Sequence, residues 1–196
     1  MGASPSESDA KAAMRSAVLQ RRRERGASDR ELAAEAIAAH LLGAAFSQVP
    51  VVACYLSTGT EPGTEPLLAA FHERGTKVIV PRAGRDRTLD WVAFEPMAER
   101  VISPLGVPEP LGALLGPRAI SDAGLVIAPA LAVDHAGWRL GRGAGYFDRA
   151  LALTRSTVCA VVYADELVDA VPHEDHDVPV DLAVTEVGVF RASRRR

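Results

Sequence analysis

The sequence is poor in cysteine. It has two cysteines in 196 residues, Cys54 and Cys159, and both lie inside apolar runs that look like strands. Two thiols in such places argue against a disulfide framework and against a zinc site. Neither has a neighbouring histidine that would lower its pKa, which argues against a catalytic thiol. The cysteine content therefore predicts a reduced compartment.

Long apolar runs and a strong excess of one charge are also missing. No apolar run approaches the roughly 20 residues of a membrane helix, and the polar N-terminal stretch lacks the order of a signal peptide. With a net charge of −3, the overall balance does not attract nucleic acid or an anionic membrane, so any anion site has to be local. The basic run 21–25 lacks interleaved aromatic residues. We expect a cytoplasmic monomer that binds neither nucleic acid nor a membrane.

The bulk composition is that of an ordinary globular domain. Hydrophobic residues make up 48% and charged residues 24%, and 196 residues suffice for one sizeable core. We find no internal repeat and no linker. The sequence predicts a disordered tail over 1–7, one domain over 8–190 and a disordered basic tail over 191–196.

Two helices are expected at the N-terminal end. Ser8 is the predicted cap of the first, and Ser28 or Asp29 the predicted cap of the second. Each then shows apolar residues at helical spacing. The predicted stripes are Ala13, Met14, Ala17 and Val18 in the first helix, and Leu32, Ala36, Ile37, Leu41 and Leu42 in the second.

Beyond these helices the apolar pattern becomes that of buried strands. Helical segments, Glu65–Arg74 and Phe147–Leu153, lie between several of the apolar runs. Alternation of this kind predicts an α/β fold: a single three-layer domain with a largely parallel central sheet flanked by helices, plus the N-terminal helical pair. The runs expected as strands are Val49–Leu56, Lys77–Val80, Leu89–Phe94, Gly124–Val133, Val158–Tyr163 and Leu182–Val187.

The most informative segment is GWRLGRGAGYFDR, residues 137–149. A buried strand leads into a glycine-rich loop and then a helix, an arrangement that turns free N–H groups and the helix dipole toward one point. Arg139 and Arg142 suit phosphate oxygens, and Asp148 suits either the dipole or Mg²⁺. The spacing is neither G-x-G-x-x-G nor a Walker loop. From these residues alone, a glycine-rich connection with solvated arginines stays open.

This segment resembles the G-x-R-L-G-x-G-x-G-[YF]-[YF]-D-R signature of the 5-formyltetrahydrofolate cyclo-ligase (methenyltetrahydrofolate synthetase) family. Further segments in the same order are similar to the family and extend the likeness over nearly the whole chain: Lys11-x-x-x-Arg15, CYLSTGTEPGT, VPRAG, GVPEP and DHDVPVDLAVTE. The resemblance implies a reaction on small-molecule substrates. ATP phosphorylates the N5-formyl oxygen of 5-formyltetrahydrofolate, N10 attacks the activated carbon, and phosphate leaves to give 5,10-methenyltetrahydrofolate.

The resemblance also implies site residues. Arg142 and Lys11 would be catalytic, and Asp148 and Asp177 would hold Mg²⁺. Leu56 and Glu61 would bind folate, together with Arg142, Gly143, Ala144, Gly145 and Tyr146. The implied ATP-binding residues are Lys11, Ala12, Ala13, Met14, Arg15, Arg139, Leu140, Gly141, Arg142, Gly143, Ala144, Gly145, Tyr146 and Phe147.

Departures and rival interpretations remain at this point. Phe147 and Ala144 replace a tyrosine and a lysine found in other members, and Pro62-Gly63 is an unusual sequel to Glu61. Without the resemblance, Lys11 and Arg15 read as a solvated basic face and Glu61 as an exposed loop residue. His173 and His176 lack the spacing of a helical zinc motif. The rival functions are a ligase for another N-formyl substrate and a non-catalytic nucleotide- or folate-binding module.

Overall fold

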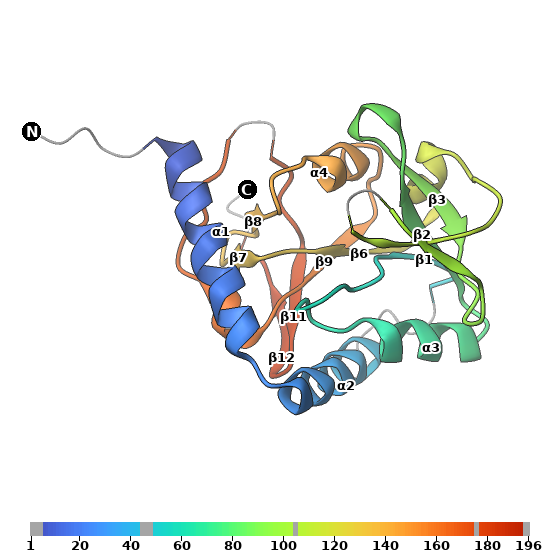
Figure 1. The fold of residues 1–196 in the computed structure, drawn as a ribbon, viewed down its shortest axis with the longest axis horizontal. Helices are drawn as coiled ribbons and strands as arrows, with labels where there is room; N and C mark the ends of the chain where they lie inside the picture. The colour runs from blue at the N-terminus through green and yellow to red at the C-terminus, as the bar shows by residue number, and fades with distance from the viewer. Residues whose placement is uncertain (1–5, 44–48, 104–105, 175–176, 194–196) are drawn as a thin grey trace, which may run out of the picture.

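A seven-stranded sheet forms the middle of the molecule (Figure 1). The computed structural model describes residues 6–43, 49–103, 106–174 and 177–193. In spatial order the strands are β12 (Gly188–Arg191), β11 (Leu182–Thr185), β9 (Thr157–Val161), β6 (Leu125–Pro129), β1 (Val51–Cys54), β2 (Lys77–Ala83) and β3 (Leu89–Ala93).

The five inner strands are parallel, and each edge is closed by an antiparallel strand. The inner strands are mostly apolar because both faces of the sheet are covered, although β2 also carries the exposed Lys77 and the partly buried Arg82. In β6, for example, residues 125–128 are all buried. The predicted largely parallel central sheet is therefore confirmed.

Helices cover both faces of this sheet. On one side α2 (Ala27–Gly43) and α3 (Glu65–Glu73) bury Ile37, Leu41 and Phe71 in one apolar cluster. On the other side α4 (Tyr146–Leu151) and the 3-10 helix η2 (Pro117–Asp122) contribute Leu151 and Ile120 to a second cluster. The layers are visible in Figure 1, with α2 and α3 below the sheet and α4 above it. This arrangement confirms the three-layer α/β prediction.

The first helix, α1 (Glu7–Glu24), packs against a separate three-stranded sheet. That sheet consists of β10 (Leu167–Val168), β7 (Ala132–Asp134) and β8 (Arg139–Leu140). Val18 of α1 joins Leu131 and Leu140 in a small apolar cluster. Because β8 leads directly into the glycine-rich segment, this packing brings α1 alongside that segment.

The helix boundaries differ from those expected. Ser6, not Ser8, caps α1: its side chain accepts a hydrogen bond from the Asp9 N–H, and the Asp9 carboxylate accepts one in return. Helix α2 begins at Ala27, so neither Ser28 nor Asp29 caps it. At the other end, Ala192 and Ser193 hydrogen-bond to Asp181 and His135, so ordered structure extends past residue 190. Residues 1–5 and 194–196 lie outside the described residues.

The predicted apolar stripes were partly wrong. In α1 both Ala13 and Ala17 are exposed, whereas Lys11 and Arg22 are buried. Leu32 of α2 is 68% exposed. The buried face of α1 includes charged side chains because its neighbours supply acidic partners, which an apolar pattern does not register.

The expected strand Gly124–Val133 is two strands. After Pro129 the chain leaves the large sheet, and the Leu131 N–H donates to the carbonyl of Leu140 in the small one. Two short strands that the sequence did not predict, β4 (Arg100–Ile102) and β5 (Pro108–Pro110), form a hairpin beyond β3. None of the described helices is long and apolar enough to span a membrane.

Candidate active site

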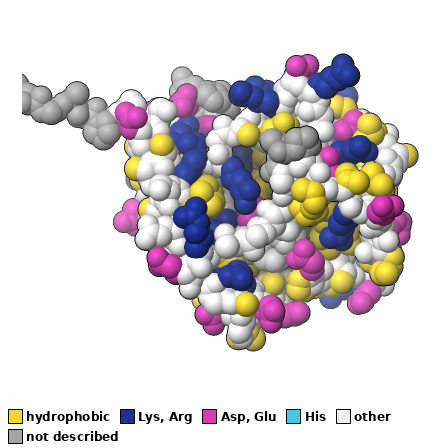
Figure 2. Space-filling model, in the orientation of Figure 1, with side chains coloured by type: hydrophobic (Ala, Val, Ile, Leu, Met, Phe, Trp, Pro, Cys, Tyr) yellow, Lys and Arg dark blue, Asp and Glu magenta, His cyan; other side chains and the backbone are white. Residues whose placement is uncertain are grey.

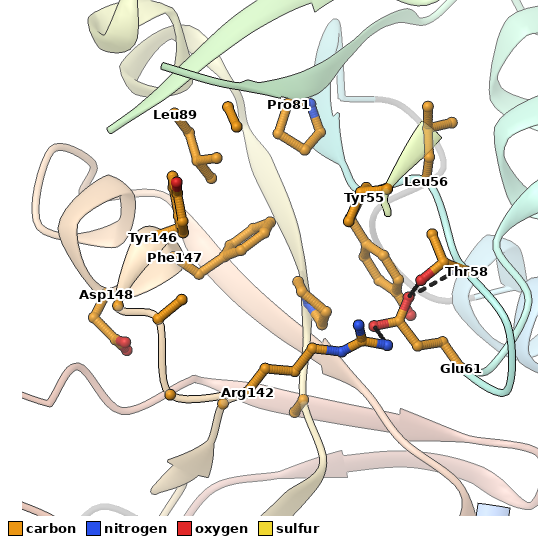
Figure 3. Close-up of a pocket in the computed structure, with 18 of the residues that line it drawn as sticks. Tyr55, Leu56, Thr58, Glu61, Pro81, Leu89, Arg142, Tyr146, Phe147 and Asp148 are labelled. Atoms are coloured by element: carbon orange, nitrogen blue, oxygen red, sulfur yellow. Dashed lines mark hydrogen bonds and ion pairs between the residues drawn. The ribbon is translucent and has the colours of Figure 1, made fainter. Parts of the chain in front are cut away.

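A cavity of about 290 Å³ lies beyond the carboxyl ends of β1 and β6, the edge where parallel sheets usually bind ligands. Figure 3 shows the glycine-rich segment and α4 on one side of it, and the loop after β1 on the other. The described lining residues come from five segments: Tyr55, Leu56, Thr58 and Glu61 after β1; Pro81, Ala83 and Leu89 from β2 and β3; Val107, Pro108 and Glu109 around β5; Pro129, Ala130 and Leu131 after β6; and Arg139, Gly141, Arg142, Gly143, Ala144, Gly145, Tyr146, Phe147 and Asp148.

The glycine-rich segment bends sharply where it passes α1. Gly143 has φ +96° and Gly145 has φ +73°, both in the region that favours glycine. The Arg15 Nε donates to the Gly141 carbonyl at 2.9 Å. A Cβ atom on Gly143 would lie 3.3 Å from the Arg15 Cζ atom. Arg15 therefore packs against the loop at Gly143, where a residue larger than glycine would not fit easily.

Lys11, four residues earlier on α1, has carboxylate partners instead. Its Nζ atom lies 2.7 Å from Asp177 Oδ2 and 3.1 Å from Glu174 Oε1. Burial alone would lower the pKa of Lys11, but hydrogen bonds to Asp177 and Glu174 outweigh that effect and raise it. Lys11 is therefore a fixed positive charge.

The remaining residues of the first predicted ATP segment are placed differently. Ala12 and Ala13 are exposed, and Met14 packs against the apolar cluster around Val18. Residues 11–15 are not among the described residues that line the cavity. Lysine and arginine side chains nevertheless gather over α1 and over the middle of the molecular face that Figure 2 shows.

Arg139 and Asp148 form an ion pair at the base of α4. The Arg139 side chain is 3% exposed, and it also donates to the Pro129 carbonyl at 3.1 Å. It thus joins the end of β6, strand β8 and the first turn of α4. Asp148 lines the cavity, whereas the guanidinium beside it is largely occupied in holding these elements together.

Arg142 and Glu61 meet across the cavity, as Figure 3 shows. Arg142 Nη2 lies 3.1 Å from Glu61 Oε1, with side-chain exposures of 51% and 9%. The other carboxylate oxygen, Oε2, accepts hydrogen bonds from the backbone N–H of Thr58 at 2.8 Å and from its hydroxyl at 3.2 Å. Glu61 is therefore not the exposed loop residue of the rival interpretation.

Apolar side chains form most of the remaining wall. Leu56 is buried, and Tyr146 and Phe147 face Tyr55 across the hollow in Figure 3. Flat rings and proline make a slot suited to a planar heterocycle. The glycine-rich segment and an apolar slot with one carboxylate thus open into the same space.

Comparison with known proteins agrees with this arrangement. The family model for 5-formyltetrahydrofolate cyclo-ligases matches residues 7–186. The 5-formyltetrahydrofolate cyclo-ligase of Mycolicibacterium smegmatis is 40% identical over 182 residues, which cover 89% of this chain and 93% of that protein. This chain belongs to the 5-formyltetrahydrofolate cyclo-ligase family. The resemblance noted in the sequence is confirmed, and the family is one of enzymes.

Other relatives extend the comparison. The 5-formyltetrahydrofolate cyclo-ligase of Escherichia coli K12 is 31% identical over 147 residues, covering 71% of this chain and 79% of that one. The NMR structure of Aquifex aeolicus 5,10-methenyltetrahydrofolate synthetase superimposes with a TM-score of 0.80 at 27% identity, covering 95% and 94% of the two chains. The synthetase from Mycoplasma pneumoniae shares the fold, with a TM-score of 0.72 at 17% identity over 90% and 98% of the chains.

The magnesium site implied by the family resemblance, with Asp148 and Asp177 as ligands, stays a prediction. Within the described residues, no three His, Cys, Asp or Glu side chains cluster in a way that could hold a metal ion. Mg²⁺ commonly takes one or two carboxylates together with phosphate oxygens and water, and Asp148 lines the cavity but is paired with Arg139. Asp177 is paired with Lys11 and would have to leave it first.

The two thiols have no part in the site. Cys54 and Cys159 are free and completely buried. Burial raises the pKa of Cys54 well above its ordinary value and that of Cys159 to about 12, so both stay protonated. The argument against a catalytic thiol is supported. His173 stacks on Trp138 with ring centroids 3.9 Å apart, and His176 lies outside the described residues.

Sequence reasoning missed several residues at or near the cavity. Thr58 holds the Glu61 carboxylate, and Glu109, which lines the wall, accepts a hydrogen bond from the Ala83 N–H at 3.0 Å. The only available signal for Glu109 was the GVPEP motif, to which we gave no role. Arg22 was given no role beyond the basic run 21–25, yet it is 1% exposed and pairs with Glu166 at 2.6 Å.

Proposed function

We propose that this cyclo-ligase family member converts 5-formyltetrahydrofolate and ATP into 5,10-methenyltetrahydrofolate, ADP and phosphate. The observation that carries the proposal is the meeting of Arg142 and Glu61 in one cavity. Arg142 comes from the glycine-rich segment, which would hold the phosphates of ATP, and Glu61 lies beside the apolar slot, which would hold the folate. Their contact would bring the two substrates next to each other.

The chemistry has two steps. The N5-formyl oxygen attacks the terminal phosphorus of ATP, and the bond to ADP breaks. N10 then attacks the activated formyl carbon, the carbon–oxygen bond breaks, and inorganic phosphate leaves with that oxygen while N10 loses its proton. The product is the methenyl bridge between N5 and N10.

On the phosphate side, the protein's task is to position the groups and neutralise their charge. Arg142 is half-exposed, so its guanidinium could exchange Glu61 for a phosphate. Arg15 fixes the loop through the Gly141 carbonyl, so the loop N–H groups keep one orientation. Lys11 would contact phosphate by exchanging Asp177 and Glu174 for phosphate oxygens.

On the folate side, the Glu61 carboxylate would accept hydrogen bonds from N–H groups on the edge of the pterin. Thr58 holds one carboxylate oxygen, and the other faces Arg142. When ATP draws Arg142 away, that second oxygen becomes available to the substrate. A buried carboxylate left without a partner is costly, so the exchange favours binding of a ligand that supplies donors.

Magnesium would be held by Asp148 together with phosphate oxygens, and by Asp177 once it is released from Lys11. When bound, the ion supplies further neutralisation of the phosphate charge. The exchange of partners at Arg142 and Lys11 does not depend on it. Monomeric state and cytoplasmic location remain predictions from the sequence; light scattering of the purified protein would test the first.

The test is an assay of purified protein with 5-formyltetrahydrofolate and Mg-ATP. We expect the methenyl chromophore to grow in step with ADP. If 5-formyltetrahydrofolate gives no chromophore and ATP is consumed only when another N-formyl compound is added, the protein is a ligase of different specificity. Binding of both compounds without turnover would identify a non-catalytic module and overturn the proposal.

A further inference from the structure

Two tyrosine hydroxyls reach the loop that carries Glu61. The Tyr55 hydroxyl donates to the Pro62 carbonyl at 3.2 Å. The Tyr163 hydroxyl donates to the Thr60 carbonyl at 3.4 Å. The two acceptors belong to the residues immediately before and after Glu61, so the hydroxyls bracket the carboxylate-bearing residue along the chain.

The loop itself is a tight turn. The Glu61 N–H donates to the Thr58 carbonyl at 3.1 Å, and Thr58 holds the Glu61 carboxylate. These contacts are internal to the turn, so they fix its shape but not its place relative to the sheet. The place has to be set by contacts from outside the turn. Tyr55, which directly follows β1, and Tyr163, which closely follows β9, provide two of them.

Tyr163 is itself held firmly. It is completely buried, and its backbone N–H donates to Glu166 Oε2 at 2.9 Å. Glu166 in turn accepts two hydrogen bonds from Arg22, at 2.6 and 2.7 Å. The Arg25 guanidinium lies 4.0 Å from the centre of the Tyr163 ring. Tyr163 therefore connects the Glu61 loop to α1 through a rigid, buried charge pair.

The hydroxyls remain donors over the working pH range. Burial raises the pKa of Tyr55 well above its ordinary value, and burial also raises that of Tyr163. Of the described residues that line the cavity, Tyr55 is one and Tyr163 is not. Any effect of the Tyr163 hydroxyl on a folate therefore passes through the loop.

We propose that Tyr55 and Tyr163 are positioning residues that set the place of Glu61 by hydrogen-bonding the carbonyls on either side of it. The inference rests on the proposed function insofar as Glu61 recognises the folate substrate. It adds that recognition depends on a residue outside the cavity, anchored to the helix that also carries Lys11 and Arg15.

Tyr163→Phe tests this most cleanly because it removes one oxygen and keeps the ring. We expect the KM for 5-formyltetrahydrofolate to rise about two- to fivefold, the effect of one modest hydrogen bond, with kcat and the KM for ATP unchanged. Tyr55→Phe should act in the same direction. The double variant should raise this KM by about tenfold or more.

Ser156→Ala is the matched control. It also removes a hydroxyl that donates to a backbone carbonyl, that of Ala123, but it does so before β9, at the opposite end of the strand from the cavity. It should leave both KM values unchanged. Thermal unfolding of every variant shows whether a change in KM merely follows lost stability.

Two results would overturn the inference: an unchanged folate KM in Tyr163→Phe, or an equal rise in the KM for both substrates. Failure of the proposed function is a separate outcome, recognised by wild-type protein that forms no methenyl product. In that case the dissociation constant of 5-formyltetrahydrofolate, measured by calorimetry for wild type and Tyr163→Phe, still decides whether the hydroxyl positions the loop.

Discussion

The two ends of α1 carry similar charges with different roles. Near its C-terminal end, Arg22 and Glu166 form an ion pair in which both side chains are 1% exposed. Near its N-terminal end, Lys11 pairs with Asp177 and Glu174, whose side chains are 17% and 45% exposed. An ion pair that is buried away from solvent stabilises the fold, because separating its partners leaves an uncompensated charge in the interior. A pair open to solvent can exchange one anion for another.

The Arg142–Glu61 pair resembles the Lys11 pair, because one of its partners is open to solvent and its cation can exchange a carboxylate partner for another anion. Arg142 is half-exposed, and a phosphate can compete for it from the cavity. The burial of the Arg22 pair suits a role in holding α1 in place, whereas on the proposed function the Lys11 and Arg142 pairs would open to bind substrate. Mutations at each should separate stability from activity.

The largest expected effect is on stability, at Arg22. Arg22→Ala leaves Glu166 buried without its cation and also removes a hydrogen bond to the Ala130 carbonyl. We expect the free energy of unfolding to fall by about 3–5 kcal/mol, measured by urea denaturation. Arg23→Ala, an exposed neighbour on the same helix, should change it by less than about 0.5 kcal/mol.

A double variant sharpens this result. Arg22→Met with Glu166→Leu removes both charges, and it should recover much of the stability that Arg22→Ala loses. If Arg22→Ala unfolds no more easily than Arg23→Ala, the Arg22–Glu166 pair is not the anchor of α1 and the comparison fails.

The second effect is on turnover, at Arg142. Arg142→Ala should lower kcat/KM by about 100-fold or more, because on the proposed function it removes the charge that would neutralise the transferred phosphoryl group. The free energy of unfolding should fall by much less than in Arg22→Ala, because Arg142 is half-exposed and the buried Glu61 carboxylate keeps its hydrogen bonds to Thr58. Arg155→Ala, an exposed arginine before β9, is the control and should keep wild-type rates. Near-wild-type rates in Arg142→Ala would remove it from the site.

The third effect concerns Lys11. Lys11→Met should raise the KM for ATP about tenfold, the loss of one charge-assisted contact. The free energy of unfolding should fall by less than in Arg22→Ala, because Asp177 and Glu174 are 17% and 45% exposed, although the Lys11 side chain is only 11% exposed. Steady-state kinetics and urea denaturation of the same variant check both halves. A large loss of stability with an unchanged KM would make Lys11 an architectural residue like Arg22.

Asp148 tests the metal assignment. Asp148→Asn keeps the shape of the side chain but removes the charge that suits Mg²⁺. We expect the magnesium concentration for half-maximal rate to rise about tenfold. Asp122→Asn, an exposed carboxylate at the end of η2, is the control. If the two magnesium titrations coincide, Asp148 is only the partner of Arg139.

The smallest effect is the pH dependence of the Lys11 pair. The folded state raises the pKa of Lys11 above its ordinary value of 10.5. The stability that the pair contributes is therefore complete below 10.5 and is lost as the pH rises through the higher, folded-state pKa. The difference in unfolding free energy between wild type and Lys11→Met should be constant from neutral pH to about pH 10 and shrink above it. A difference that instead grows at high pH would contradict the assigned partners.

The sequence predicted the parts of the structure that local patterns encode. Each of the six strand-like runs overlaps one strand of the large sheet, because strands covered on both faces are mostly apolar. The glycine-rich segment could be found because positive φ, as at Gly143 and Gly145, strongly favours glycine. Such signals reside within a dozen consecutive residues.

The parts that the sequence did not predict depend on distant partners. Arg22 was given no role beyond the basic run 21–25, because its carboxylate partner lies 144 positions further on. The Tyr163 hydroxyl reaches the Glu61 loop from 103 positions away. In the same way, Asp177 was read as a magnesium ligand before its pairing with Lys11 was visible. Apolar periodicity does not identify a charged residue that is buried by a neutralising contact.

The most direct test of the central claim follows the formyl oxygen. 5-Formyltetrahydrofolate carrying a heavy-oxygen label in the formyl group is converted with Mg-ATP, and the phosphate released is examined by mass spectrometry. The account predicts that each phosphate carries the label, because the cavity directs the formyl oxygen onto the terminal phosphorus. Unlabelled phosphate accompanying methenyl product would contradict it.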